Sequence, residues 1–322
     1  MKKTLKFAAV LLAAAASTAF AAEPSASSKP IRLVTALPAG ADTYVRLLAQ
    51  RLTELMGQSA VVENRPGGAW VPAARMVITS PPDGHTLLVY SVVILISKNL
   101  QPSLNYDPVG DFTPIAKIYG DGGALLVVSP DGPFRTLQDL VAFAKSAPGK
   151  AMHGGSHGTS SHLGAASFLA AAGAKGYHVP FKGPGDDFAA IQRGDIHFSV
   201  TAATVSLPQV TAGKLRALAV TSGNRIRNIP DVPTLREALN NEMLVQDNWT
   251  GLAGPLKMPA AMVTRLHAET QKVLNDAAMR KVIDAGGNTP SIGETTDQFG
   301  AFIRRENEKW REIVKVSGLK IE

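Results

Sequence analysis

The sequence predicts an α/β protein made of two domains, and three observations support this fold class. Short apolar, β-branched runs alternate with amphipathic segments from Ile31 to Tyr90. The same alternation begins again at Ala124, and Gly- and Ser-rich loops lead from strands into helices in both parts. Such alternation is typical of a parallel or mixed sheet covered by helices. A chain of 322 residues, 45% of them hydrophobic, is long enough to bury two cores.

The first part of the chain shows strand and helix periodicity in turn. Val45, Leu48, Leu52 and Leu55 recur at helical spacing, and Gly57 is expected to end their helix. Apolar β-branched runs bounded by Gly, Pro or Asp predict strands. The expected elements are strands over 31–37, 60–63 and 86–90 and helices over 42–57 and 73–80.

After Ala124 the pattern is similar, and Thr136 is expected to cap a helix. The expected strands are 124–128, 177–180, 196–200 and 216–221, and the expected helices are 137–145, 161–172 and 186–193. Beyond Pro230 the sequence predicts mostly helix, over 234–239, 259–275, 277–284 and 296–316.

The N-terminus has the order of a secretory signal peptide. Lys2, Lys3 and Lys6 precede an apolar stretch over 7–16, and small residues follow up to Ala21. We expect residues 1–21 to be removed as a signal peptide, because the apolar stretch is too short for a permanent transmembrane helix. The sequence contains no Cys, which excludes disulfides and a lipid anchor on an N-terminal cysteine. These features predict a periplasmic protein.

The charge pattern argues against nucleic acid as a partner. The formal net charge of +7 falls to +4 when the three lysines of the expected signal peptide are removed. Lys and Arg are spread along the chain and are not clustered with aromatic residues. The mild positive charge favours a small anionic ligand.

Residues 152–168 suggest a functional site, and one interpretation is an exported serine hydrolase. Gly154-Gly155-Ser156-His157-Gly158 fits the G-x-S-x-G pattern of a nucleophile elbow between a strand and a helix. Such a short Gly-rich pattern also arises by chance, and no downstream histidine stands in an obviously catalytic position. Nucleophilic catalysis by Ser156 is therefore the alternative and not the preferred interpretation.

Metal and nucleotide binding are less favoured. His153, His157 and His162 offer imidazole ligands, but Gly154-Gly155 makes a helix that would align the first two unlikely to form. The phosphate-binding pattern G-x-x-x-x-G-K-[ST] and the dinucleotide pattern G-x-G-x-x-G are both missing from this stretch. We therefore expect no metal site and no cofactor.

The third interpretation is a seat for a carboxylate. Thr159, Ser160 and Ser161 stand where a helix is expected to begin, so hydroxyls, unpaired N–H groups and the positive end of the helix dipole coincide. The alternative is that these hydroxyls only cap the helix. A similar turn, Pro38-Ala39-Gly40-Ala41-Asp42-Thr43, opens the first helix. Two such turns in separate halves predict one ligand held between them.

An ordered series of motifs from residue 29 onward resembles the Bug family, the substrate-binding receptors of tripartite tricarboxylate transporters. The motifs are Lys29-Pro30-Ile31-Arg32, Pro38-Ala39-Gly40, Asp42, Val62-Glu63-Asn64-Arg65-Pro66-Gly67, Pro82-Asp83-Gly84, Tyr106-Asp107-Pro108-Val109, Asp111-Phe112, His162-Leu163, Val179-Pro180-Phe181-Lys182-Gly183, Ala212-Gly213-Lys214-Leu215-Arg216-Ala217-Leu218-Ala219 and Asp231-Val232-Pro233-Thr234. The number of motifs in one order makes the resemblance specific.

The resemblance implies a periplasmic binding protein-like fold, with two α/β domains, a central cleft and two crossover segments. Domain 1 would comprise residues 22–124 and 223–322, and domain 2 residues 125–222. The domains would close around a small organic carboxylate, aliphatic or aromatic, and deliver it to two membrane subunits of the transporter. The resemblance implies a monomer without enzymatic activity or a cofactor.

The resemblance also implies which residues bind the ligand. The two carboxylate seats correspond to Pro38, Ala39, Gly40, Ala41, Asp42 and Thr43 and to Gly155, Ser156, His157, Gly158, Thr159, Ser160 and Ser161. Further expected ligand-binding residues are Trp70, Ser91, Lys182, Gly183 and Thr201. Thr201 stands where many relatives carry an aspartate, which favours an anionic guest here. For Trp70 a place in the core, and for Asp42 a helix cap, remain equal alternatives. Trp249 is expected to pack beneath the hinge.

Overall fold

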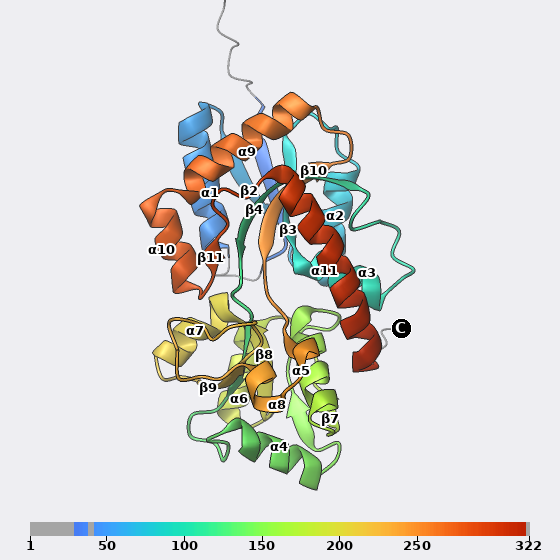
Figure 1. Ribbon diagram of the computed structural model, residues 1–322, viewed down its shortest axis with the longest axis vertical. Coiled ribbons are helices and arrows are strands. Elements are labelled where there is room, and N and C mark those ends of the chain that lie inside the picture. The colour runs from blue at the N-terminus through green and yellow to red at the C-terminus, as the bar shows by residue number, and fades with distance from the viewer. Residues whose placement is uncertain (1–28, 38–41, 320–322) are drawn as a thin grey trace, which may run out of the picture.

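The computed structural model describes residues 29–37 and 42–319, which form two lobes, each built on a mixed sheet covered by helices (Figure 1). The strand order is β11-β4-β10-β3-β1-β2 in the first sheet and β7-β6-β8-β5-β9 in the second. This arrangement confirms the α/β fold class. None of the helices within the described ranges has the length and apolar character needed to cross a bilayer. The expected signal peptide, residues 1–21, lies outside the described residues.

In the first lobe, the sheet is the middle layer of three. Its elements are β1 (Ile31–Thr35), α1 (Thr43–Met56), β2 (Ala60–Asn64), the 3-10 helix η1 (Gly68–Trp70), α2 (Val71–Ile78), β3 (Thr86–Ser91), α3 (Val92–Leu100), β4 (Phe112–Gly120), β10 (Thr250–Pro255), α9 (Ala260–Leu274), α10 (Ala277–Ala285), β11 (Thr289–Pro290) and α11 (Thr296–Ser317). Helices α2, α3 and α11 pack on one face and α1, α9 and α10 on the other. Strand β1 runs parallel to β2 and β3, whereas β10 lies antiparallel between β3 and β4.

The second lobe repeats the layered design. Its elements are β5 (Ala124–Val128), α4 (Leu137–Ser146), β6 (Ala151–His153), α5 (Ser160–Ala171), β7 (Gly176–His178), α6 (Pro184–Arg193), β8 (Phe198–Ala202), α7 (Ala203–Thr211), β9 (Arg216–Val220), α8 (Leu235–Leu239) and the 3-10 helix η2 (Glu242–Leu244). Helices α4, α5 and α8 cover one face, and α6 and α7 cover the other. Strand β6 is parallel to β7 and β8, and β5 is antiparallel to β8 and β9.

The chain passes from one lobe to the other between β4 and β5 and again between η2 and β10 (Figure 1). We call residues 121–123 the first crossing segment and residues 245–249 the second. The Thr221 hydroxyl joins these segments, because it accepts a hydrogen bond from the Ala124 N–H (2.8 Å) and donates one to the Gln246 carbonyl (2.7 Å). Asn248 adds a bond from its amide nitrogen to the Gly123 carbonyl (2.8 Å). The two crossing segments are therefore tied to one another where they leave the second lobe.

Two short elements after residue 222 pack with the second lobe. Leu235 of α8 and Leu244 of η2 are buried in the core that contains α4 and α5. The expected division of the chain, with 125–222 as domain 2, would assign both elements to domain 1, and that division stays a prediction.

Local sequence signals correctly marked several boundaries. Helix α1 ends at Gly57, whose φ of 61° is the left-handed conformation that glycine adopts readily. Thr136 caps α4 in a capping box with Asp139.

The expectation of mostly helix beyond Pro230 is wrong over Thr250–Pro255, which forms the central strand β10. This strand contains Gly251, where a Cβ atom would overlap the ring of Phe299, so the glycine allows α11 to pack closely on the sheet.

Helix α11 is fastened to the second crossing segment by a buried carboxylate. Glu306 accepts hydrogen bonds from the indole N–H of Trp249 (2.9 Å) and of Trp310 (3.1 Å). Both indoles are 1% exposed. Lys309 lies 3.4 Å from the other carboxylate oxygen and balances its charge. Trp249 thus packs beside the crossing segment, between the sheet and α11.

Replacing Glu306 by leucine is expected to destabilise the protein by about 2–5 kcal/mol, because two buried indole N–H groups lose their acceptor. Glu306→Gln keeps an acceptor oxygen and is expected to cost less than half as much. Urea unfolding followed by tryptophan fluorescence measures both. A leucine variant as stable as the glutamine variant would contradict this role for Glu306.

Candidate ligand-binding site

A cavity of about 720 Å³ lies between the two lobes, within the size range of small-molecule sites. It is lined by the loops that follow β1, β2 and β3 in the first lobe, by the loops that open α5, α6 and α7 in the second, and by the second crossing segment. Ten of the expected ligand-binding residues line it: Trp70, Ser91, Ser156, His157, Thr159, Ser160, Ser161, Lys182, Gly183 and Thr201.

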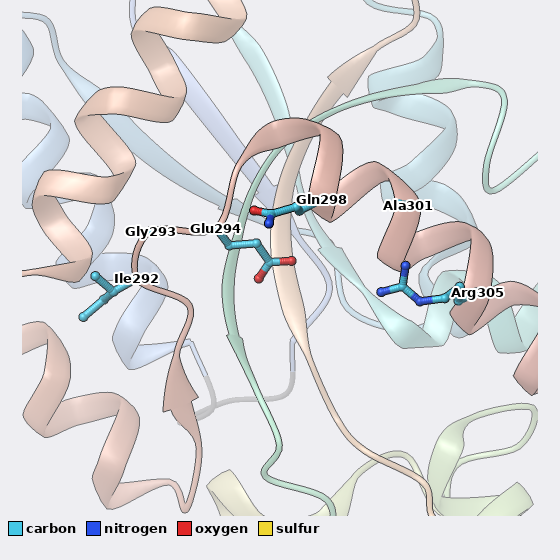
Figure 2. Close-up of a pocket in the computed structure, with 6 residues that line it drawn as sticks. All are labelled: Ile292, Gly293, Glu294, Gln298, Ala301 and Arg305. Carbon is cyan, nitrogen blue, oxygen red and sulfur yellow. The ribbon is translucent and has the colours of Figure 1, made fainter.

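A smaller hollow of about 440 Å³ lies on the first lobe alone (Figure 2). It is bounded by the turn before α11 and by one side of that helix, with Glu294 and Arg305 among its lining residues. None of the expected site residues lines this hollow. The cavity between the lobes is therefore the candidate site.

The first expected carboxylate seat is only partly described. Pro38, Ala39, Gly40 and Ala41 lie outside the described residues. Asp42 and Thr43 are not among the residues that line the cavity. The Asp42 carboxylate makes no cap bond to α1 and instead pairs with the Arg46 guanidinium at 2.7 Å, so the helix-cap interpretation is wrong. Ligand binding by this loop stays a prediction.

Among the described elements, five helices begin at residues that line the cavity: α2 and α3 from the first lobe and α5, α6 and α7 from the second. A helix N-terminus presents unpaired N–H groups and about half a positive charge. Parallel strands place these ends together, because loops at the carboxyl ends of the strands share one edge of the sheet. The backbone therefore makes the cavity suitable for an anion.

The start of α5 has no side-chain cap. The Thr159 hydroxyl donates to the Ser156 carbonyl at 2.7 Å and does not accept a bond from the helix, so it does not cap α5. Within the described residues, no acceptor bonds to the N–H groups of Ser160 and Ser161. The alternative expectation, that the hydroxyls simply cap this helix, is thus wrong for Thr159. The helix start is free to donate to a guest in the cavity.

The loop before α5 requires glycine. Gly155 has a φ of 135°, and a Cβ atom there would lie 3.1 Å from the backbone nitrogen of His162. Its N–H donates to the Asp187 carboxylate at 3.2 Å. Asp187 is 2% exposed and lines the cavity, and burial raises its pKa to about 7. Gly155 and Gly158 do not themselves line the cavity.

The loop after β2 holds an unusual backbone conformation. Gly67, Gly68, Ala69 and Trp70 have φ angles of 94°, 55°, 47° and 70°. Ala69 and Trp70 each bear roughly 1–2 kcal/mol of strain in this left-handed region. The Ser97 hydroxyl stabilises the turn by donating to the Ala69 carbonyl at 2.8 Å. Strain of this kind gathers at ligand-binding loops, which supports a functional role for this segment.

The place of Trp70 in the core is confirmed, whereas its contact with a ligand stays a prediction. It is buried in the core of the first lobe and also lines the cavity. Trp249 is a second aromatic lining residue, stacked on Tyr90 with 5.8 Å between ring centroids. On the opposite lobe, the Thr201 hydroxyl shares a 2.8 Å hydrogen bond with Ser199. The cavity lining thus combines aromatic side chains with hydroxyl groups.

Sequence reasoning missed several lining residues, including Asp187, Asn248 and Asn288. Asp187 lies in the first turn of α6, where an acidic residue is usual at a helix N-terminus and carries no functional signal. Asn248 and Asn288 come from segments that are distant in the sequence from the Gly-rich turns. Only the tertiary fold brings them to the cavity.

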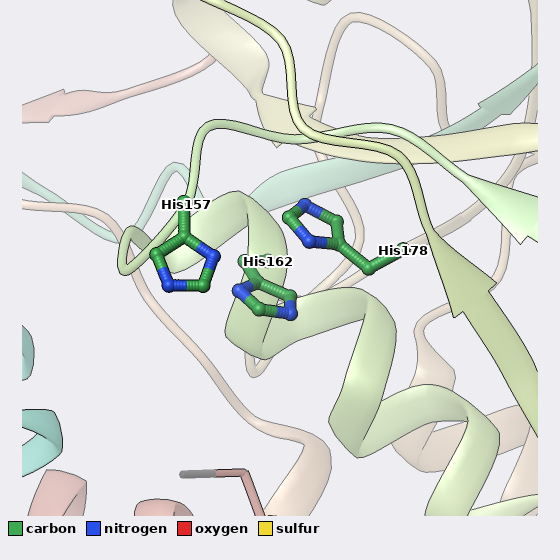
Figure 3. Close-up of side chains that lie close together, drawn as sticks. All are labelled: His157, His162 and His178. Atoms are coloured by element: carbon green, nitrogen blue, oxygen red, sulfur yellow. The ribbon is translucent and has the colours of Figure 1, made fainter. Parts of the chain in front are cut away.

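The histidines gather in a different combination from the one considered in the sequence. His157 and His162 meet His178, at the end of β7 (Figure 3). Burial and the neighbouring histidines lower the pKa of His162 to about 3, and burial lowers the pKa of His178. His153 lies beside the group, its Nδ1 3.3 Å from the Gly154 carbonyl. Pairing of β6 with β7 places His178 opposite His153 and so brings it to this group, which the spacing of the residues does not reveal.

The contacts of Ser156 do not form a catalytic triad. Ser156 lies between β6 and α5, as a nucleophile elbow requires. Within the described residues, however, no histidine is hydrogen-bonded to its hydroxyl. The His178 Nε2–H donates instead to the Gly155 carbonyl, at 2.8 Å.

Comparison with known proteins places the chain in a family. The model of the tripartite tricarboxylate transporter family receptor, TctC, matches residues 44–319. Protein BugT of Bordetella pertussis is 29% identical over 326 residues, which cover 100% of this chain and 99% of BugT. Two solved structures are also similar. An R. palustris protein with adipate has 28% identity and a TM-score of 0.84, over 91% of this chain and 99% of that one.

The second structure is MatC from Rhodopseudomonas palustris with bound malate. It is 26% identical, with a TM-score of 0.80 over 88% of this chain and 99% of MatC. These matches confirm the resemblance to the Bug receptors and the periplasmic binding protein fold. The chain belongs to the TctC family of tripartite tricarboxylate transporter receptors, a family of solute-binding receptors and not of enzymes.

Proposed function

We propose that this receptor captures a small organic carboxylate in the cavity between its lobes. The observation that carries the proposal is the convergence of five helix N-termini from both lobes on one cavity. In the periplasm, as a monomer, the receptor delivers its guest to two membrane subunits of a tripartite tricarboxylate transporter. The neighbours that hold adipate and malate support the choice of a carboxylate.

One carboxylate of the guest binds at the start of α5. The amides of Ser160 and Ser161 and the nearby hydroxyls donate to its oxygens, and hydrogen bonds to an ionised acceptor are about twice as strong as neutral ones. Lys182 at the edge of the cavity adds a positive charge. The binding energy comes mainly from preorganised backbone groups, and binding requires no catalytic residue.

The first lobe covers the other end of the guest. The strained loop 67–70 and the loops after β1 and β3 lie on this side of the cavity. Trp70 and Trp249 provide apolar contact area, so a guest with a flat or aliphatic middle section fits better than a fully hydroxylated one. Closure about the crossing segments excludes water and strengthens every polar contact inside.

A panel of ligands tests the substrate class. Aliphatic and aromatic mono- and dicarboxylates are expected to raise the melting temperature, because they bind only the folded state. The neutral amides of the same acids serve as matched controls and are expected to leave it unchanged. Thermal shift identifies the best acid, and calorimetry gives its affinity. Stabilisation by sugars or cationic amines but by none of the acids would contradict the proposal.

Thr201→Asp is expected to weaken binding of the best acid at least about tenfold, because the new aspartate would repel the negatively charged guest. Thr201→Asn is the control of similar size without the charge, and its affinity is expected to stay close to wild type. Calorimetry measures both after circular dichroism has shown that the variants fold. Equal affinities of the two variants would place the guest away from Thr201.

The raised pKa of Asp187 predicts a pH dependence. Below its pKa of about 7 the side chain is neutral, and above it the carboxylate repels an anionic guest. Affinity is therefore expected to fall roughly three- to tenfold from about pH 6 to about pH 8. In Asp187→Asn the amide oxygen still accepts from Gly155, and the part of the fall that is due to Asp187 is expected to disappear. Other titrating groups are common to both proteins, so parallel profiles would contradict this role of Asp187.

A further inference from the structure

We infer that His157, His162 and His178 form a binding site for a divalent transition-metal ion, with zinc as the ion to test. One nitrogen from each ring lies within 4.8 Å of the other two. The rings come from three separate pieces of the second lobe, namely the loop before α5, the first turn of α5 and the end of β7 (Figure 3). This site shares His157 with the lining of the cavity, but zinc binding to the three imidazoles does not depend on the proposed function.

The cluster contains a buried nitrogen without a partner. His162 is 5% exposed, and within the described residues its Nδ1 has no hydrogen-bond partner. A buried polar atom of this kind is costly unless something binds it. A metal ion would satisfy a group that the protein leaves unsatisfied.

His178 has the environment of a metal ligand. Its Nε2 lies 2.8 Å from the Gly155 carbonyl, which fixes the proton on that nitrogen and leaves the Nδ1 lone pair free. Histidines that bind metals usually donate their second N–H to a carbonyl or carboxylate in this way. Gly155 is also the residue whose left-handed backbone shapes the loop, so the turn that positions His157 orients His178 as well.

The rings have to move slightly to bind an ion. His162 and His178 are stacked, with 3.6 Å between centroids and 12° between planes, and His157 lies 5.3 Å from His162. Zinc binds imidazole nitrogens at about 2.0–2.1 Å, which places tetrahedral ligands about 3.3 Å apart. Ring rotation must therefore open the stack and bring the nitrogens closer by up to about 1.5 Å. Three neutral imidazoles suit zinc, copper or nickel and not magnesium or calcium.

Calorimetry with zinc chloride tests the site directly. The protein is purified without a polyhistidine tag, freed of metal by dialysis against EDTA, and titrated in a buffer without carboxylates. One zinc ion is expected to bind per chain. His157→Ala and His178→Phe are each expected to weaken zinc binding at least about tenfold, because a ligand is lost. The titration contains no carboxylate ligand and therefore does not test carboxylate binding. Failure of zinc to bind would leave the carboxylate proposal intact.

His267→Gln is the matched control, since it removes a histidine of the other lobe that bonds to the Ile115 carbonyl. Its zinc affinity is expected to equal that of the wild type. The side chain of His157 is exposed, so its alanine variant is expected to fold, and circular dichroism without metal verifies this. Zinc is expected to raise the melting temperature of the wild type and of His267→Gln but not of His157→Ala. No zinc uptake by the wild type, or equal uptake by all three variants, would overturn the inference.

Discussion

The direction of the strands in the two sheets is the constraint on which the rest of the structure depends. In the first lobe β1, β2 and β3 are parallel, so the loops at their carboxyl ends lie at one edge of the sheet. In the second lobe the loops that open α5, α6 and α7 lie at the edge that faces them. The crossing segments, joined through Thr221 and Asn248, hold these edges opposite each other. Helix N-termini from both lobes therefore meet in one cavity, and among its described lining residues Lys182 is the one lysine or arginine.

The cavity also shows where the protein tolerates unfavourable local structure. Ala69 and Trp70 adopt left-handed backbone angles, and Asp187 is a buried carboxyl next to a site suited to anions. Natural proteins accept such costs chiefly where function requires them. The folded state is stabilised outside the cavity, by the layered hydrophobic cores and by the hydrogen bonds of Glu306 to two tryptophans. Well-packed cores thus flank a cavity that contains a strained loop and a buried carboxyl.

Local periodicity was sufficient to predict the fold class and most helices from the sequence. Gly57 and Thr136 marked helix boundaries because their effects are local. Strand β10 and helix α3 were missed for different reasons. The glycines of β10 are explained only by distant neighbours, Phe299 for Gly251 and Met258 for Gly254. The run from Val92 to Ile96 is apolar throughout, so it shows no helical periodicity.

The site was predictable only in part. The turn from Ser156 to Ser161 and Trp70 could be identified because each stands beside a recognisable strand, turn or motif. Asp187, Asn288 and the meeting of His178 with His162 depend on pairings between distant segments, which residue spacing does not report. Asp42 shows the opposite case, since its position suggested a cap while its carboxylate pairs with Arg46.

A crystal structure with the most strongly stabilising acid tests the central claim most directly. The account predicts electron density for that acid between the lobes, with one carboxylate within hydrogen-bond distance of the Ser160 and Ser161 amides and the rest against Trp70. An acid bound on the outer surface, or one whose carboxylates contact none of the helix N-termini around the cavity, would contradict it.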